Sequence, residues 1–289
     1  MITSDRTKWY ALALLCAVQF MVVLDIAIVN VALPSIQTDL GFSQENLQWV
    51  ISAYALFFGG FLLLGGRAAD LLGRRRLFIV GLIVFSASSL LSGFAWSEES
   101  LIVARAIQGF GAAIITPAAL SILMTTFSEG RDRNAALGVW GGVGAFGAVA
   151  GVLLGGILTD AFSWEWIFYI NVPVGLAALA LTPLLLTESR DAHVKTFDAL
   201  GAVLVTAGLV TLVFAITQAN EYGWTSAATI GLFTGAGALL AGFVGWELRA
   251  KEPLVPFSIF RVKTLTAANI SGLILGTVTF SMFLMLTLY

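Results

Sequence analysis

Residues 48–96 read QWVISAYALFFGGFLLLGGRAADLLGRRRLFIVGLIVFSASSLLSGFAW, two apolar runs joined by a short basic stretch. Each run is close to the roughly 20 residues that a helix needs to cross about 30 Å of hydrocarbon. The stretch between the runs ends in three consecutive arginines, which do not belong inside a bilayer. This segment therefore predicts two membrane-spanning helices joined on one side of the membrane.

Comparable apolar runs occur along the whole chain. Hydrophobic residues make up 58% of the 289 residues and charged residues 11%, against about 25% charged residues in an ordinary soluble domain. The mean hydropathy is +0.94, and a soluble fold is excluded. Nine segments are long and apolar enough to span a bilayer: 9–33, 48–66, 77–96, 101–124, 136–158, 165–186, 198–219, 226–247 and 265–289. The alternation typical of membrane β-barrel strands is missing, so we expect an all-α integral membrane protein.

The composition also excludes several functional classes. The single cysteine, Cys16, cannot form a disulfide framework, and a net charge of −2 without a basic domain argues against nucleic-acid binding. Cys16 and the single histidine, His193, are too few for a cysteine–histidine metal site. The sequence shows no nucleophile–base set. We therefore expect neither an enzyme nor a bound metal or cofactor.

Charge divides the loops into two sets. Fourteen of the 15 Lys and Arg residues lie on one side of the predicted membrane, and the fifteenth, Arg105, lies inside a span. The basic set comprises Arg6, Lys8, Arg67, Arg74, Arg75, Arg76, Arg131, Arg133, Arg190, Lys195, Arg249, Lys251, Arg261 and Lys263. The opposite loops contain only acidic charges. The positive-inside rule places the basic side in the cytoplasm, so we expect a multi-pass protein of the cytoplasmic membrane with a cytoplasmic N-terminus.

The basic stretch of the opening segment, residues 65–76, has an order that charge alone does not explain. A generic cytoplasmic loop accounts for the arginines but not for Asp70 at the end of the span, nor for Gly73, which permits a sharp turn. The arginines can pair with Asp70 or with carbonyl groups at helix C-termini. The stretch resembles the G-x-x-x-D-x-x-G-R-[RK] signature of the major facilitator superfamily. The signature positions are occupied by Gly66, Asp70, Gly73, Arg74 and Arg75.

The first span contains an acidic residue. Its sequence LDIAIVNVALPSI, residues 24–36, resembles the helix-1 pattern of the drug/proton antiporters within this superfamily. An acid inside a span costs about 2.5–3.5 kcal/mol and usually faces the interior of the helix bundle. Asp25 is therefore a candidate proton carrier or cation contact, and Asn30 is a candidate supporting residue. The alternative is a structural Asp25 that hydrogen-bonds a neighbouring helix.

The fourth span begins with an intramembrane arginine. Residues 105–117, RAIQGFGAAIITP, resemble the helix-4 motif of the superfamily, whose arginine is thought to assist proton transfer. Arg105 and Gln108 are three residues apart and share a helix face, so Gln108 is, like Asn30, a candidate supporting residue for the substrate or the coupling. At 1.5 Å per residue, Asp25 lies roughly 12 Å and Arg105 roughly 6 Å below the outer surface, so we expect their side chains to interact. The alternative is an Arg105 that extends to the outer interface.

The fifth span is rich in glycine. Gly147, Gly151 and Gly155 recur at four-residue steps on one face, which allows another helix to approach closely. Together with Gly138 and Gly156 they match the antiporter motif G-x8-G-x3-G-P-x2-G-G. Val152 replaces the proline of this motif, so the helix retains a backbone hydrogen bond and should kink less.

The sixth span also resembles this family at its start, SWEWIFYINVPVG, residues 163–175. Trp164 and Trp166 are explained by an aromatic belt at the membrane interface. Asn171, Pro173 and Gly175 fit the family pattern, and we assign no chemistry to them.

The resemblance implies a division of the chain into five parts. These are a six-helix transport domain at 9–186, a cytoplasmic linker at 187–197, two additional spans at 198–247, a cytoplasmic amphipathic connection at 248–264, and the first span of a C-terminal domain at 265–289. The additional spans carry no charge within the membrane and look like the extra pair of 14-span drug exporters. The chain stops at Tyr289 directly after an apolar run, so we expect it to be part of a longer protein.

The resemblance implies a proton-coupled exporter of lipophilic or cationic drugs that works by alternating access. Its expected partners are a small-molecule substrate, protons, the lipid bilayer and a C-terminal half without which transport does not occur. Two alternatives are an exporter of one endogenous metabolite and a non-transporting membrane receptor or regulator on the same fold. Asp25 and Arg105 argue against the receptor, because a scaffold need not keep charges inside spans.

Overall fold

The computed structural model describes residues 5–190, 198–250 and 253–288, and these ranges contain helices but no strand. Eight helical stretches within them are long and apolar enough to cross a membrane. They coincide with the first eight predicted spans, and helix α11 (Lys263–Leu288) coincides with the ninth. The protein is therefore an all-α, multi-pass membrane protein, as its composition predicts.

The first six spans form one helical unit. They are α1 (Asp5–Leu40), α3 (Trp49–Leu72), α4 (Arg74–Gly93), α5 (Glu98–Thr126), α6 (Arg131–Ala161) and the pair α7 (Trp166–Tyr169) and α8 (Asn171–Leu185), with a single turn, α2 (Gln44–Leu47), between α1 and α3. The chain continues with α9 (Ala199–Tyr222), α10 (Ala227–Glu247) and a short 3₁₀ helix, η1 (Phe257–Arg261), before α11.

Several helices are longer than the predicted spans, because apolar runs report the thickness of the bilayer rather than the length of the helix. The first span was predicted to end at residue 33, but α1 continues through Pro34 and ends before Gly41. The φ angle of Gly41 is +72°, the left-handed conformation that commonly follows a helix. The sixth span is interrupted at Ile170, which separates α7 from α8.

The predicted connections between the spans lie only partly within the described residues. Only the first part of the predicted linker, residues 187–190, lies within the described residues, and 191–197 lie outside them. The predicted amphipathic connection at 248–264 contains the five-residue η1, and its residues 251–252 also lie outside the description. The predicted pair of additional spans corresponds to α9 and α10. Glu247, the last residue of α10, is buried with 4% of its surface exposed.

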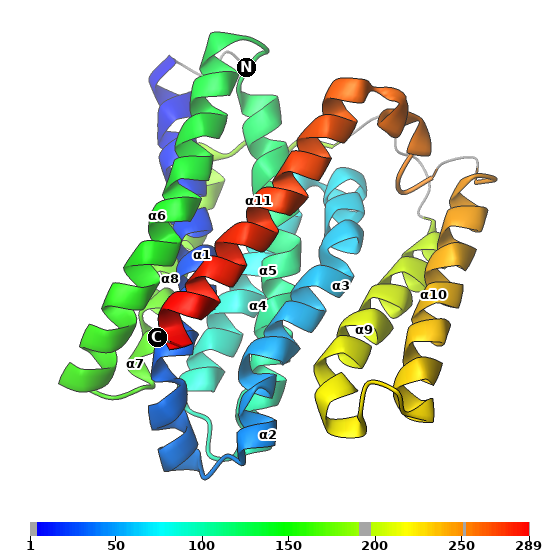
Figure 1. Cartoon of the computed structure of the whole chain (residues 1–289). Helices are drawn as coiled ribbons and strands as arrows, with labels where there is room; N and C mark the ends of the chain where they lie inside the picture. Colours follow the sequence, from blue (N-terminus) through cyan, green and yellow to red (C-terminus); the bar gives the residue numbers. More distant parts are fainter. Residues whose placement is uncertain (1–4, 191–197, 251–252, 289) are drawn as a thin grey trace.

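Two apolar clusters fill the six-helix unit. One includes Val18 and Val22 of α1, and the other includes Leu24 and Ile28 of the same helix. Helix α1 packs along α6, while α5 packs against α3 and α4. Helices α9 and α10 form a hairpin beside α3 (Figure 1), and α9 makes the contact with α3. Asp25 thus lies on α1 where the two apolar clusters meet.

Candidate functional site

Asp25 lies at the centre of a buried polar network. The residue is completely buried, and its carboxylate accepts three side-chain hydrogen bonds. Arg105 Nη1 donates to Oδ2 at 2.6 Å, and Gln108 Nε2 and Asn171 Nδ2 each donate to Oδ1 at 2.8 Å. Three helices, α5, α8 and α1, therefore meet at one carboxylate. The structure brings Asp25 and Arg105 together, as their predicted depths indicate.

Arg105 is held from several directions. Its Nη1 also donates to Gln108 Oε1 at 2.7 Å, and its Nε donates to the Val50 carbonyl of α3 at 3.1 Å. The guanidinium carbon lies 4.4 Å from the centre of the Tyr54 ring and 5.6 Å from that of Phe168, so aromatic faces add a cation–π attraction. Only 1% of Arg105 is exposed. The alternative of an arginine that extends to the interface is therefore wrong.

Two members of the network were missed by the sequence analysis. Asn171, at the start of α8, also donates to Ser89 Oγ at 3.1 Å, and Ser89 donates in turn to the Phe168 carbonyl at 2.9 Å. Both side chains are buried. A polar residue inside an apolar run was the available signal; Asn171 was noted for its fit to the family pattern but assigned no chemistry, and Ser89 was not singled out. The network therefore draws on α1, α3, α4, α5, α7 and α8.

Asn30, predicted as a supporting residue, does not join the network. Its side chain is exposed and donates to the Ile26 carbonyl of its own helix at 3.0 Å. Five residues beyond Asp25 correspond to about 140° of rotation in an α-helix, so the two side chains leave α1 in different directions. Of the two predicted supporting residues, only Gln108 contacts Asp25.

The network is electrically balanced and buried. One carboxylate faces one guanidinium, and uncharged amides and a backbone carbonyl satisfy further hydrogen bonds of both groups. Removing one partner of such a buried pair typically costs about 3–5 kcal/mol, because the other charge is left uncompensated. Tyr54 adds a buried hydroxyl that has no hydrogen-bond partner among the described residues.

The loop between α3 and α4 forms a second charged cluster. Arg74 donates from Nε and Nη2 to Asp70 Oδ1 at 3.0 and 2.8 Å, which is the predicted pairing with Asp70. Arg75 Nη1 donates to the Leu186 carbonyl at 3.1 Å, where α8 ends. This contact is the predicted pairing with a helix C-terminus. Gly66 lies on α3 where an added Cβ would be 3.4 Å from Pro117 of α5.

Glu188, which the sequence analysis did not single out, completes this loop. Its carboxylate accepts hydrogen bonds from the backbone N–H groups of Arg75 and Arg76, at 3.1 and 3.2 Å. A carboxylate at a helix N-terminus is favourable because it faces the positive end of the helix dipole. Gly73 has a φ of +115°, and a Cβ there would lie 2.8 Å from Glu188 Oε1. Only glycine permits both the turn and the contact.

The glycine stripe of α6 packs against α1. A Cβ on Gly147 would lie 3.1 Å from the Phe20 carbonyl, and one on Gly151 would lie 2.7 Å from Ala27 Cβ. Gly155 approaches the Ile28 carbonyl in the same way. Gly138 and Gly156 have nothing within 4 Å of such a Cβ. Three glycines of the motif thus pack against α1, and two have no neighbouring atom within 4 Å. Helix α6 continues without interruption past Val152, which stands in place of the motif's proline.

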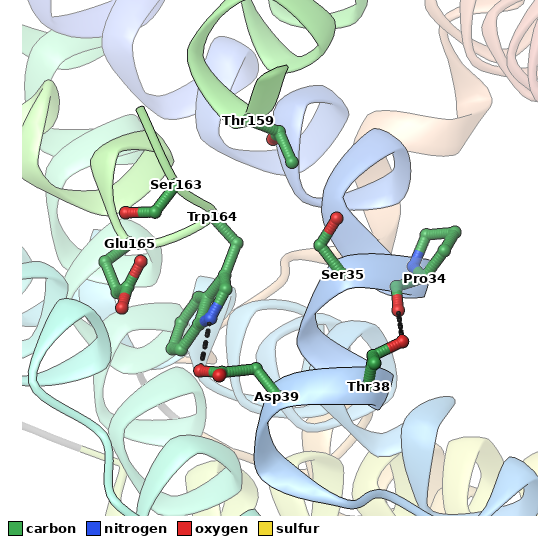
Figure 2. A pocket seen from close by; sticks show the side chains of 8 residues that line it. All are labelled: Pro34, Ser35, Thr38, Asp39, Thr159, Ser163, Trp164 and Glu165. Atoms are coloured by element: carbon green, nitrogen blue, oxygen red, sulfur yellow. Dashed lines mark hydrogen bonds between the residues drawn. The ribbon is translucent and has the colours of Figure 1, made fainter. Parts of the chain in front are cut away.

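A separate polar pocket lies where the far end of α1 meets the loop after α6. Figure 2 shows the indole of Trp164 directed toward Asp39, and its Nε1 donates to Oδ2 at 2.9 Å. The cavity measures about 620 Å³ and is lined by Pro34, Ser35, Thr38, Asp39, Thr159, Ser163, Trp164 and Glu165. Asp39 is 14 residues beyond Asp25, roughly 21 Å along the helix. The pocket is therefore separate from the Asp25 network.

Comparisons with known proteins agree with this architecture. The family model described as Major Facilitator Superfamily matches residues 15–289. The puromycin resistance protein pur8 of Streptomyces alboniger is 44% identical over 87% of this chain and 50% of its own length. The cephamycin export protein CmcT of Amycolatopsis lactamdurans is 42% identical over 99% of this chain and 60% of its own length. The uncharacterized MFS-type transporter EfpA of Mycobacterium tuberculosis is 42% identical over 94% of this chain and 51% of its own length.

The chain thus spans 50–60% of the length of these three relatives. Solved structures with a similar fold include a peptide transporter POT in complex with sulfate, with a TM-score of 0.61 and 16% identity over 83% of this chain and 53% of that chain. The POT family transporter PepTSo gives a TM-score of 0.60 and 18% identity over 84% of this chain and 52% of that chain. At such identities the likeness concerns the fold alone.

Proposed function

This chain belongs to the Major Facilitator Superfamily, and we propose that it is the N-terminal part of a proton-coupled exporter of lipophilic or cationic drugs. Membership of a transporter family means that the chain is not an enzyme. In this proposal residues 9–186 form the N-terminal transport domain, and 198–247 add a pair of spans outside it. The relatives named for puromycin resistance and cephamycin export support a drug or antibiotic as cargo.

The observation that carries the proposal is the buried contact of Asp25 with Arg105, Gln108 and Asn171. A proton on Asp25 would neutralise the carboxylate and weaken its attraction to Arg105. Arg105 would still have Gln108 Oε1 and the Val50 carbonyl as acceptors. Its charge would therefore keep partial compensation while Asp25 is neutral. A reversible exchange between two partner sets is what a proton-coupling site requires.

Alternating access connects this exchange to transport. Two halves of the protein would rock around a central site, and the chain holds one half with the first helix of the other. Protonation of Asp25 weakens a contact that joins α1 to α5, so it would favour one arrangement of these helices over the other. The C-terminal half is required in this scheme, because no rocking is possible without it.

The experiment uses the full-length protein in proteoliposomes. Drug efflux is measured with and without an imposed pH gradient for the wild type, Asp25→Asn and Asp160→Asn. Asp160 is an exposed acid at the end of α6 and serves as a matched control for loss of one carboxyl. We expect the Asp25 variant to insert normally and to lose the gradient-driven component, while the control retains it. Gradient-driven efflux that survives in Asp25→Asn refutes proton coupling through this residue.

The same measurement separates the alternatives. An exporter of one endogenous metabolite would retain pH-driven transport but reject a panel of chemically unrelated drugs. A receptor or regulator on the same fold would show no net flux of any compound. Wild-type flux of several unrelated lipophilic cations distinguishes the proposed function from both.

A further inference from the structure

Two carboxyl groups meet at the end of the α9–α10 hairpin opposite its turn, and the transport proposal uses neither. Asp198 is the residue that caps the start of α9, and Glu247 is the last residue of α10. Their side chains lie beside each other against Gly201. A Cβ on Gly201 would collide with both Asp198 Oδ2 and Glu247 Oε1. Glycine at position 201 therefore allows the two carboxyls to face one another.

Glu247 has one satisfied and one unsatisfied oxygen. Its Oε2 accepts a hydrogen bond from the backbone N–H of Val255 at 2.9 Å. Its Oε1 is buried and has no hydrogen-bond partner among the described residues, and only 4% of Glu247 is exposed. Two oxygens that can only accept cannot bond to each other, so a proton or a cation is needed between them.

The surroundings distinguish the two acids. Asp198 accepts from the Gly201 N–H at 2.9 Å, and the Trp246 indole N–H lies 2.9 and 3.0 Å from its two oxygens. It also lies at the positive end of the α9 dipole, where a negative charge is favourable. Glu247 is buried, lies at the negative end of α10 and faces Asp198. Each of these conditions opposes a charge on Glu247.

We propose that Glu247 binds a proton and donates its O–H to Asp198, which makes the pair a proton-binding site separate from Asp25. The charged groups around it fit this assignment. On the side of α9, the charged group that faces Glu247 is Asp198, the residue that caps this helix. Next to Glu247 on the same helix end, the Arg249 guanidinium donates to the Gly245 carbonyl. Residues 253–257, which lie against Glu247 through Val255, contain no charge. No described Lys or Arg forms an ion pair with either acid.

The proton secures the chain segment that leads to α11. Glu247 accepts the hydrogen bond from the Val255 N–H. Two residues later, the Phe257 ring packs edge-on against Phe243 of α10, with ring centres 6.4 Å apart. In the protonated form, Glu247 thus joins the start of α9, the end of α10 and residues 253–257. Removal of the proton creates two adjacent carboxylates, which repel each other. This repulsion would displace the Glu247 side chain from its buried position and break its bond to the Val255 N–H, so the segment is held at acidic pH and released as the pH rises.

The test is hydrogen exchange of the full-length protein in lipid nanodiscs, with mass-spectrometric readout of the peptide that contains Val255. After correction for the intrinsic exchange rate, wild-type protection should fall as the pH rises. Glu247→Gln keeps a donor toward Asp198 without a titratable proton, so its protection should no longer change with pH. Glu221→Gln, at the other end of α9, is the matched control and should behave as the wild type.

Asp198→Asn provides a second variant. It removes the negative charge that would repel a deprotonated Glu247, and the Asn amide can donate to the Glu247 carboxylate, so protection should persist as the pH rises. Infrared difference spectra of the wild type should show a carboxylic-acid band that titrates with this transition and is absent in Glu247→Gln. A band that persists in Glu247→Gln overturns the assignment. Protection that follows sodium or calcium concentration at constant pH assigns a metal cation to the pair and overturns it equally.

Discussion

Arg105 and Asp25, 80 residues apart in the sequence, form a 2.6 Å ion pair inside the six-helix unit. The guanidinium has two further acceptors, the Val50 carbonyl and Gln108 Oε1. The carboxylate has two further donors, Gln108 Nε2 and Asn171 Nδ2. Each charge therefore has uncharged partners besides the other charge, which is the property that the proposed proton coupling requires.

Arg105→Ala should destabilise the protein by about 3–5 kcal/mol, because a buried carboxylate loses its cation. Thermal unfolding of the purified full-length protein at neutral pH measures the loss. The double variant Asp25→Asn with Arg105→Gln removes both charges and should recover part of the stability. A single Arg105→Ala variant as stable as the wild type would show that the pair does not compensate a buried charge.

Asn171→Ala should shift the pH profile of transport toward higher pH. The substitution removes one hydrogen bond to the Asp25 carboxylate, so the carboxylate becomes less favourable relative to its protonated form. The profile is measured as drug efflux by the full-length protein at a series of pH values. Asn30→Ala is the matched control, since Asn30 is on the same helix as Asp25 but outside its network. Equal profiles for the two variants would exclude Asn171 as a positioning residue.

Most of the fold was predictable, because membrane spans depend on length and hydropathy within about 20 residues of sequence. Asp25, Arg105 and Gln108 were predictable for a related reason, since polar groups in a span stand out against apolar neighbours. Asn171 and Ser89 were not, because their role depends on which helices pack together across about 80 residues of sequence. Glu188 was missed for the same reason, as it acts on an N-terminus more than 110 residues earlier.

Gly151→Ala should destabilise the packing of α6 on α1. The added Cβ would lie 2.7 Å from Ala27 Cβ and 2.9 Å from the Leu24 carbonyl, and overpacking of this kind costs about 1–3 kcal/mol. Gly156→Ala, on the same helix with no atom within 4 Å, should be neutral or slightly stabilising, because alanine favours helix by up to about 1 kcal/mol. Thermal unfolding in detergent compares the two. Equal stability of both variants contradicts the close packing.

Glu188→Ala should loosen the start of α4 by about 0.5–2 kcal/mol, the usual effect of losing a helix cap. The measurement is limited trypsin digestion of the full-length protein, with cleavage after Arg74, Arg75 or Arg76 identified by mass spectrometry. Cleavage should be faster in this variant than in the wild type. Glu129→Ala removes an exposed acid from the loop before α6 and should leave cleavage unchanged. Equal rates in the two variants would exclude Glu188 as the cap.

The separation of Asp25 and Arg105 along the chain has a consequence for biosynthesis. Ribosomes add about 5–20 residues per second, so the first helix waits about 4–16 s for the arginine that will neutralise it. During this interval its acid must enter the bilayer unaccompanied, at a cost of about 2.5–3.5 kcal/mol. The most apolar 18-residue window of α1 has a mean hydropathy of 2.6, the highest among the eight spanning stretches, which favours insertion in spite of this penalty. The hydrophobicity of α1 is therefore needed most during synthesis, before Arg105 is available to neutralise Asp25.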